Sequence, residues 1–197
     1  PLGRVDTFGY DDAGRFATMT DPSGRAAAYT YDAAGRLVDT SYTDGVATRT
    51  VGRSYDAAGR TTSVSDDTGA VSMTRDARGR ITSVTDADGA TMSYTYDANG
   101  NQTSITYPDG TVGARSYDSR NRLTSVDQPG FSATYSYDAD GRVAQTVING
   151  VTRTYSYVDG RLSQVDDSDA GVTTYTYDAV GRLVGLSGTF SATYVYD

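Results

Sequence analysis

Short runs of alternating hydrophobic and polar residues extend along the whole chain, and turn residues separate one run from the next. Residues 80–85 read RITSVT, and residues 91–96 read TMSYTY. Both runs are rich in β-branched and aromatic residues, which favour strands. Asp88-Gly89 lies between them, and an Asp-Gly pair in this position is a strong signal for a tight hairpin turn. The pattern predicts short antiparallel strands, each about five to eight residues long, joined in chain order.

A seven-residue motif recurs along the chain and divides it into units. It reads YDAAGRL at residues 31–37, most copies begin 20 or 21 residues apart, and a second turn signal follows in each unit. The copies begin at Tyr10, Tyr31, Tyr55, Arg75, Tyr96, Tyr117, Tyr137, Tyr157 (one residue shorter), Tyr177 and Tyr196, where the chain end cuts the copy off. One repeat therefore predicts one hairpin. We expect a single array over residues 1–197, with about nine hairpins, a truncated tenth and no separate second domain.

The fold class follows from this count. About twenty antiparallel strands in one open sheet would accumulate the usual right-handed twist, and sheets that wide rarely stay flat. We therefore predict an all-β fold in which tandem antiparallel hairpins form a long, twisted or spiralling strip.

Tyrosines mark one face of the predicted sheet. Tyr29 and Tyr31 are two residues apart, so their side chains point to the same face, while Thr30 between them points to a wetter one. The rings are expected to form a structural packing seam that contains Tyr10, Tyr29, Tyr31, Tyr55, Tyr94, Tyr96, Tyr117, Tyr135, Tyr137, Tyr155, Tyr157, Tyr175, Tyr177, Tyr194 and Tyr196. Each motif also contains a glycine that can supply a positive φ in the turn. These turn glycines are Gly14, Gly35, Gly59, Gly79, Gly100, Gly141, Gly160 and Gly181.

Composition and charge exclude several functions. The chain has no Cys, His or Trp, all 17 cationic residues are Arg, all 25 anionic residues are Asp, and the net charge is −8. An acidic protein binds nucleic acid poorly, because phosphate binding needs a basic surface. No apolar run reaches the length of a membrane span. Without His or Cys, the usual hydrolase bases and zinc sites cannot be assembled. We expect no catalytic residues, no cofactor, no nucleic-acid partner and no enzymatic activity.

Two sets of charged residues suggest possible sites. The acidic stretch at Asp166, Asp167 and Asp169 is a weak calcium candidate, but it lacks the spacing of known calcium loops, so turn structure is the preferred interpretation. The arginine after each turn glycine could bind an anionic sugar or a phosphate. Its regular spacing instead favours a ladder of Arg–Asp pairs between neighbouring hairpins. These arginines are Arg15, Arg36, Arg60, Arg80, Arg142, Arg161 and Arg182.

The repeated YDxxGR motif resembles the YD-repeat, or Rhs-repeat, family over essentially the whole chain. That family includes bacterial Rhs proteins, the shell proteins of Tc toxins, wall-associated repeat proteins and the teneurins. The resemblance implies a β-strip that spirals into a hollow shell, which in bacterial toxins encloses a toxin domain. No Rhs-associated core segment with self-cleavage residues is present in this sequence, so that activity is assigned to no residue here.

Three functions are consistent with these features. The first is a structural scaffold, a wall segment of an encapsulating toxin shell or of another secreted or cell-surface bacterial protein. Its expected partners are neighbouring repeats of the same or an identical chain and an encapsulated toxin domain. The second is a self-assembling extracellular fibre or tube joined through open hairpin edges. The third is a glycan-binding module that uses the tyrosine and arginine rows. Pro1-Leu2-Gly3-Arg4 aligns with residues 22–25, so we also expect the chain to be part of a longer array or a unit whose ends meet copies of itself.

Overall fold

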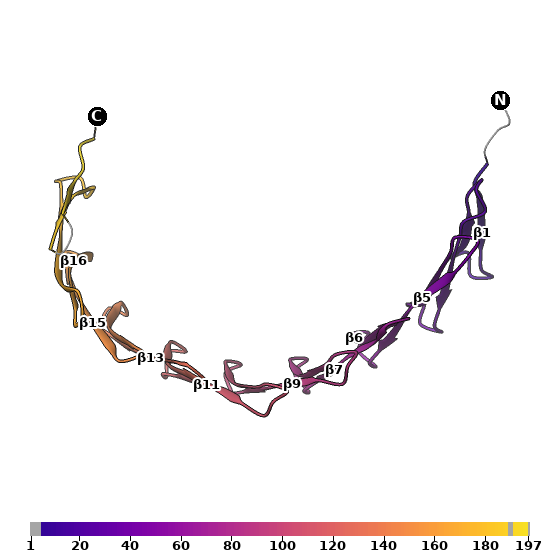
Figure 1. The fold of residues 1–197 in the computed structure, drawn as a ribbon, viewed down its shortest axis with the longest axis horizontal. Helices are drawn as coiled ribbons and strands as arrows, with labels where there is room; N and C mark the ends of the chain where they lie inside the picture. Colours follow the sequence, from indigo (N-terminus) through magenta and orange to yellow (C-terminus); the bar gives the residue numbers. More distant parts are fainter. Residues whose placement is uncertain (1–4, 189–190, 197) are drawn as a thin grey trace. The chain divides into compact units, whose positions relative to one another are not determined.

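The computed structural model describes residues 5–188 and 191–196, and 19 strands in these ranges form one open antiparallel sheet in chain order (Figure 1). The all-β class and the tandem hairpin order predicted from the sequence are confirmed. The chain divides into two compact units, residues 1–94 and residues 95–197, which are described separately. That the repeats form a single array without a second domain stays a prediction. Pro1–Arg4 and Asp197, which were aligned with other repeats, lie outside the described residues.

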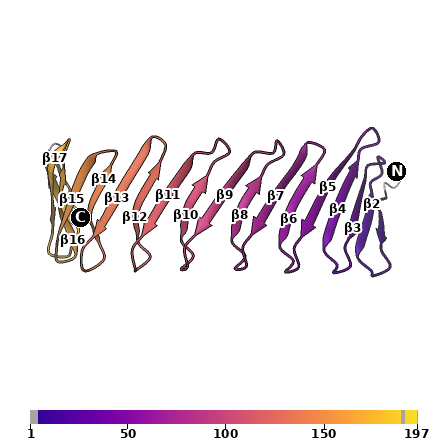
Figure 2. The same cartoon turned by 90° about the horizontal axis from the view of Figure 1, so that it is seen from below.

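The first unit contains eight complete strands and most of a ninth. Their bounds are β1 (Thr7–Tyr10), β2 (Phe16–Thr20), β3 (Ala26–Tyr31), β4 (Leu37–Thr43), β5 (Thr48–Tyr55), β6 (Thr61–Asp66), β7 (Gly69–Arg75), β8 (Ile81–Thr85) and β9 (Thr91–Tyr96). Consecutive strands run in opposite directions. The YDxxGR turns lie at one edge of the unit, and the second turns of the repeats lie at the opposite edge (Figure 2).

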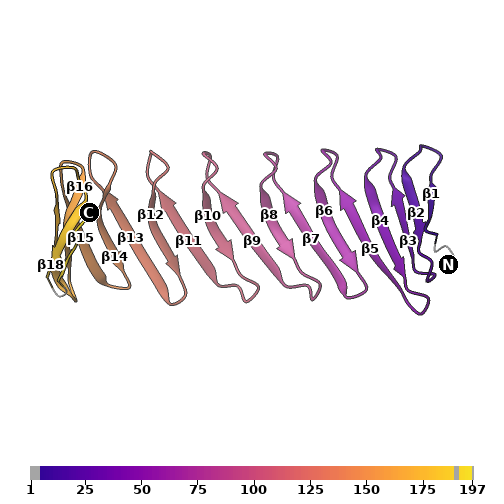
Figure 3. The same cartoon turned by 90° about the horizontal axis from the view of Figure 1, so that it is seen from above.

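The second unit repeats this plan. Its strands are β10 (Gln102–Thr106), β11 (Val112–Tyr117), β12 (Leu123–Gln128), β13 (Phe131–Tyr137), β14 (Val143–Ile148), β15 (Val151–Val158), β16 (Arg161–Asp167), β17 (Gly171–Tyr177), β18 (Leu183–Ser187) and β19 (Ala192–Thr193). In this unit too, the hairpins follow one another along the sheet without a crossover (Figure 3).

A β-bulge interrupts the strand pairing beside the YDxxGR turn. In the β3–β4 hairpin, Thr30 pairs with Asp39 but Tyr31 pairs with Leu37, so Val38 is an extra residue. This extra residue keeps Leu37 and Thr40 on the tyrosine face although they are three residues apart. The strict alternation expected from the sequence therefore fails here. The same register shift occurs in the hairpins β1–β2, β5–β6, β7–β8, β11–β12, β13–β14, β15–β16 and β17–β18.

Each unit is a single layer of sheet and encloses little core. Among the described residues, Ala133 is the only buried hydrophobic residue, and no large side chain is fully buried. The tyrosine face is half-buried because neighbouring hairpins cover one another only from the side. The residue between the two tyrosine positions is exposed on the opposite face in each of these repeats: Thr30, Ser54, Thr74, Thr95, Ser116, Ser136, Ser156 and Thr176.

Candidate functional site

The YDxxGR turn is built around one aspartate carboxylate. In the turn at residues 32–36, Oδ1 of Asp32 accepts hydrogen bonds from the backbone N–H groups of Ala34 and Arg36, both at 2.9 Å. Oδ2 of Asp32 accepts a third bond from Nε of Arg36 at 2.7 Å. Gly35 closes the turn with a φ of 81°, which an L side chain rarely adopts. One short side chain thus holds both the backbone of the turn and the guanidinium that follows it.

The same pairing recurs in both units with little variation. Nε of the arginine lies 2.7 Å from Oδ2 of the aspartate four residues earlier in each of these pairs: Asp11–Arg15, Asp32–Arg36, Asp56–Arg60, Asp76–Arg80, Asp118–Arg122, Asp138–Arg142 and Asp178–Arg182. The ladder of Arg–Asp pairs between neighbouring hairpins, expected from the sequence, is therefore wrong. The carboxylate belongs to the same turn as the arginine.

Hydrogen bonding shifts the titration of these carboxylates. The backbone N–H of Arg36 is the main cause that lowers the pKa of Asp32, and its guanidinium adds to the effect against opposing desolvation. At Asp138, desolvation acts to raise the pKa, but the hydrogen bonds from Arg142 outweigh it and the pKa is lowered. These aspartates are therefore ionised in the folded protein at neutral pH, as the ion pairs require.

The arginine connects its own hairpin to the next one. The guanidinium carbon of Arg36 lies 4.8 Å from the centre of the Tyr55 ring, which begins the following turn. The hydroxyl of Tyr55 donates a 2.7 Å hydrogen bond back to the carbonyl of Leu37. Cation–π stacking and this hydrogen bond close a lateral contact between hairpins. We call the arrangement of the turn aspartate, the arginine and the next tyrosine the Asp–Arg–Tyr contact.

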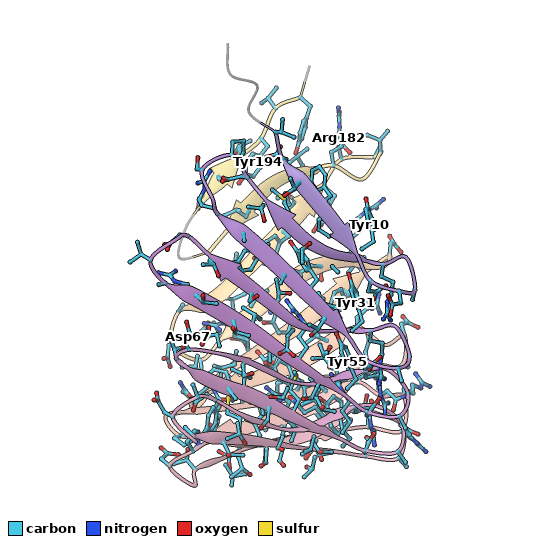
Figure 4. All side chains as sticks on the ribbon, turned by 90° about the vertical axis from the view of Figure 1, so that its right-hand side faces the viewer. Tyr10, Tyr31, Tyr55, Asp67, Arg182 and Tyr194 are labelled. Carbon is cyan, nitrogen blue, oxygen red and sulfur yellow. The ribbon has the colours of Figure 1, made fainter. Side chains whose placement is uncertain are left out.

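This contact recurs on both sides of the unit boundary. Guanidinium-to-ring distances of 4.1–4.8 Å are found for Arg15–Tyr31, Arg36–Tyr55, Arg122–Tyr137, Arg142–Tyr157 and Arg182–Tyr196. The tyrosine hydroxyl bonds a carbonyl of the preceding hairpin at 2.7–3.0 Å in the pairs Tyr31–Phe16, Tyr55–Leu37, Tyr117–Gln102, Tyr137–Leu123, Tyr157–Val143, Tyr177–Leu162 and Tyr196–Leu183. In the first unit, Tyr10, Tyr31 and Tyr55 lie along one edge. Asp67, in the turn between β6 and β7, lies at the other edge (Figure 4).

The other tyrosine of each pair faces the neighbouring strand of its own hairpin. Tyr29 lies opposite Thr40, and Tyr135 lies opposite Thr146. Both threonines are buried, with exposed fractions of 3% and 6%. The predicted seam tyrosines therefore have two different environments. The first tyrosine of a pair, such as Tyr29, lies beside the partner strand of its own hairpin, whereas the second, such as Tyr31, reaches the preceding hairpin with its hydroxyl. All eight predicted turn glycines have a positive φ.

Three repeats depart from the common contact. The turn after Tyr157 consists of Asp159 and Gly160 alone, so Arg161 has no aspartate four residues earlier and lies 5.9 Å from the Tyr177 ring. In the Asp97 turn, Asn101 replaces the arginine and donates to Asp97 at 2.8 Å. Arg75 occupies the tyrosine position of its repeat. A gap or substitution in the motif marks each departure in the sequence.

The calcium candidate is occupied by other contacts. Oδ2 of Asp167 accepts a 2.5 Å hydrogen bond from Nε of Arg153, and Oδ1 accepts from the backbone N–H groups of Asp169 and Ala170. Within the part of the chain that the structure describes, no three His, Cys, Asp or Glu side chains gather in a group that could hold a metal ion. The structure does not bring the carboxylates of Asp166, Asp167 and Asp169 together as ligands.

Comparison with known proteins places this geometry in a family. The Teneurin YD-shell profile matches residues 4–133, more than half of the chain, and the RHS Repeat profile matches residues 158–193. Comparison with curated proteins yields no match. Over the residues described here, no helix is long and apolar enough to cross a membrane.

Solved structures show the same fold at low sequence identity. The crystal structure of TcdB2-TccC3-TEV matches with a TM-score of 0.59 and 18% identity, over 97% of this chain and 12% of that one. The crystal structure of TcdB2-TccC3-Cdc42 matches with a TM-score of 0.56 and 18% identity, over 93% of this chain and 11% of that one. This chain therefore spans only a small part of those proteins. With more than half of its length matched by the family profile, the chain belongs to the Teneurin YD-shell family.

Proposed function

We propose that this chain is a structural scaffold, a wall segment of a YD-repeat shell in a secreted or cell-surface bacterial protein. The observation that carries the proposal is the Asp–Arg–Tyr contact. Its aspartate, guanidinium and tyrosine hydroxyl recur with the YDxxGR motif, and each contacts its own or an adjacent hairpin. These groups therefore hold the wall together and are not arranged around a substrate.

The single-layer sheet supports the same role. A free-standing globular domain buries a core between two layers, whereas each unit here leaves its tyrosine face half-exposed. Such a face is suited to line the inside or the outside of a wall. The neighbouring repeats of the same or an identical chain are the proposed first partners. A toxin domain enclosed by the completed shell is the proposed second one.

Electron microscopy of the native polypeptide tests this function. The protein is isolated from its source with an antibody raised against this chain and imaged without crosslinking. Closed hollow particles are the expected result. Long open filaments would overturn the proposal in favour of the self-assembling fibre, because a fibre needs its edge strands to pair without closing.

Glycan binding is a second candidate, supported by one groove. A hollow of about 640 Å³ lies in the first unit, where the small side chain of Ala27 leaves space between Met19, Tyr29 and Tyr42. Tyrosine rings are suitable platforms for sugar rings, and charged side chains at the rim could orient hydroxyl groups. A glycan-array screen tests this candidate. Binding that is lost in Tyr42→Ala supports it, and a folded chain without hits removes it.

A further inference from the structure

The short turn at residues 158–161 leaves its arginine without a carboxylate. In the turn at residues 138–142, by contrast, the aspartate four residues earlier lies 2.7 Å from Nε of the arginine. At the short turn, Val158 pairs directly with Arg161, and only two residues lie between them. Within the described ranges, Arg161 forms no ion pair. The short turn therefore keeps the cation of the motif and lacks the anion.

A hollow of about 500 Å³ lies beside this guanidinium, within the range of sites that hold small ligands. Val158 and Arg161 form one side of it, and Tyr177 and Ala179 of the next hairpin form the other. The hydroxyl of Tyr177 donates to the carbonyl of Leu162 at 2.9 Å, which fixes the ring in the wall. The unpaired cation and the hollow thus occur at the same repeat.

Two aspartates also line the hollow, but neither pairs with the arginine of the short turn. Oδ2 of Asp178 accepts from Nε of Arg182 at 2.7 Å, and its Oδ1 accepts from the backbone N–H groups of Val180 and Arg182. Asp159 lies at the tip of the short turn with a φ of 50° and forms no ion pair with the described residues. The guanidinium of Arg161 is therefore available to a ligand.

The walls favour a ligand that carries one carboxylate on an apolar body. A guanidinium can bind a carboxylate through two parallel N–H···O bonds. Next to it, Val158 is 62% exposed, and the Tyr177 ring lies 5.9 Å from the guanidinium of Arg161. An apolar group beside the carboxylate would cover this surface and remove it from water. The negative charge of Asp159 disfavours a ligand with a second anionic group.

We propose that the hollow at the short turn is a binding site for an organic carboxylate with an apolar body, whose carboxylate pairs with Arg161 as Asp138 pairs with Arg142. This inference goes beyond the scaffold role, because it concerns a ligand of one repeat and not the contacts that hold the wall together. A free carboxylic acid and the C-terminal residue of a peptide carry the same recognised group. Because the guanidinium is exposed, we expect weak binding, with a Kd of about 1 mM.

Titration of the full chain with N-acetylleucine tests the site. The Nε–H resonance of Arg161 and the backbone resonance of Ala179 are followed by NMR. N-acetylleucinamide, which has the same apolar body without the charge, is the reference ligand. Saturable shifts are expected for the acid alone. In Arg161→Gln, the affinity should fall about tenfold or more.

A second variant keeps the arginine and supplies an internal competitor. Replacement of residues 158–161 with the sequence Asp-Ala-Asp-Gly-Arg of residues 138–142 places a carboxylate four residues before the arginine. This carboxylate should occupy the guanidinium and reduce binding as much as Arg161→Gln does. The matched control Arg120→Gln removes one exposed arginine from another turn of the same unit and should leave the affinity unchanged.

Several results would overturn the proposal. They are the absence of a saturable response in the wild type, equal binding of the acid and the amide, binding by either altered turn as tight as that of the wild type, and a loss in Arg120→Gln as large as that in Arg161→Gln. An N-acetylated tripeptide that ends in leucine distinguishes the two sources of the carboxylate. Tighter binding of the tripeptide assigns the site to a peptide C-terminus, and equal or weaker binding assigns it to a free acid.

Discussion

The YDxxGR turns of two consecutive repeats in the second unit end in the same Gly-Arg pair but hold the arginine differently. In the turn at residues 138–142, Nε of Arg142 lies 2.7 Å from Asp138, and the guanidinium lies 4.5 Å from the Tyr157 ring. In the shorter turn at residues 158–161, Arg161 has no carboxylate four residues earlier and lies 5.9 Å from the Tyr177 ring. The loss of one residue thus moves the guanidinium away from the ring.

The tyrosine hydroxyl bond does not follow the arginine. Tyr157 donates to the carbonyl of Val143 at 2.9 Å, and Tyr177 donates to the carbonyl of Leu162 at the same distance. The two halves of the lateral contact therefore have different causes. Strand pairing and the bulge position the hydroxyl, whereas the turn aspartate positions the guanidinium.

Strong acid should weaken the turns in which an aspartate pairs with the arginine, because protonation removes the carboxylate charge that the short turn at residues 158–161 lacks. The pKa of Asp138, Asp32 and the equivalent aspartates is lower in the folded chain than the ordinary value of 3.8. Their ionised form therefore stabilises the fold above that value, and this contribution is lost as the pH falls through the lower folded pKa. The urea midpoint should stay nearly constant from neutral pH to about pH 5 and then fall steeply towards about pH 2.5. An equal midpoint at both extremes would contradict the assigned role of the turn carboxylates.

Removal of one ring should be the most damaging single substitution at a complete contact. Tyr157→Ala deletes the stacking surface for Arg142 and the hydroxyl bond to Val143. Because Tyr157 is only half-buried, the free energy of unfolding should fall by about 2–3 kcal/mol, below the range for a fully buried ring. Urea denaturation measures the change.

Tyr157→Phe is the control that separates the two halves. It keeps the ring under Arg142 and removes only the hydroxyl, so it should cost about 0.5–1.5 kcal/mol. If Tyr157→Phe costs as much as Tyr157→Ala, stacking contributes nothing and the interpretation of the contact is incorrect.

Neutralising the turn carboxylate should release Nε of the arginine without moving the tyrosine. Asp138→Asn keeps the shape of the side chain but removes the charge that pairs with Nε of Arg142, while Nη2 of Arg142 keeps its 2.7 Å ion pair with Asp140. The Nε–H resonance of Arg142 should shift towards that of a free arginine, with a smaller loss of stability than in Tyr157→Ala. The matched change Asp159→Asn, in the short turn at a φ of 50°, should leave Arg161 unaffected because no such pair exists there. Equal responses of the two arginines would contradict the comparison.

Lengthening the short turn should restore the Asp–Arg–Tyr contact in this repeat. Replacement of residues 158–161 with the sequence Asp-Ala-Asp-Gly-Arg of residues 138–142 supplies the missing carboxylate and the missing residue. The arginine should then stack on Tyr177, and its Nε–H resonance should shift towards that of Arg142. The gain in stability should be slight, because exposed ion pairs contribute little. A guanidinium that stays away from the ring would show that the turn aspartate is not what places it.

The sequence predicts much of the fold because its signals are local. Asp-Gly pairs, β-branched runs and a motif every 20 or 21 residues define the hairpins and their order. The two-residue period places Tyr29 and Tyr31 on one face, in the pattern of a half-buried strand. The β-bulge is not predicted in this way, since Leu37-Val38 reads as ordinary strand sequence on either register. Its position depends on how the turn closes.

The partners of the arginines are likewise not readable from spacing. Every hairpin carries the same Asp and Arg, so a repeat pattern cannot distinguish a pair within one turn from a pair between two turns. Chain connectivity decides this, because Arg36 follows Asp32 by only four residues and the turn brings its Nε to 2.7 Å from the carboxylate of Asp32. Local signals along the chain are thus enough to specify an all-β fold of tandem hairpins with a tyrosine face and glycine turns. The three-dimensional packing is needed to show that the guanidinium of each turn with an Asp–Arg pair is held by its own aspartate and lies on the next ring, because lateral packing brings the two hairpins together.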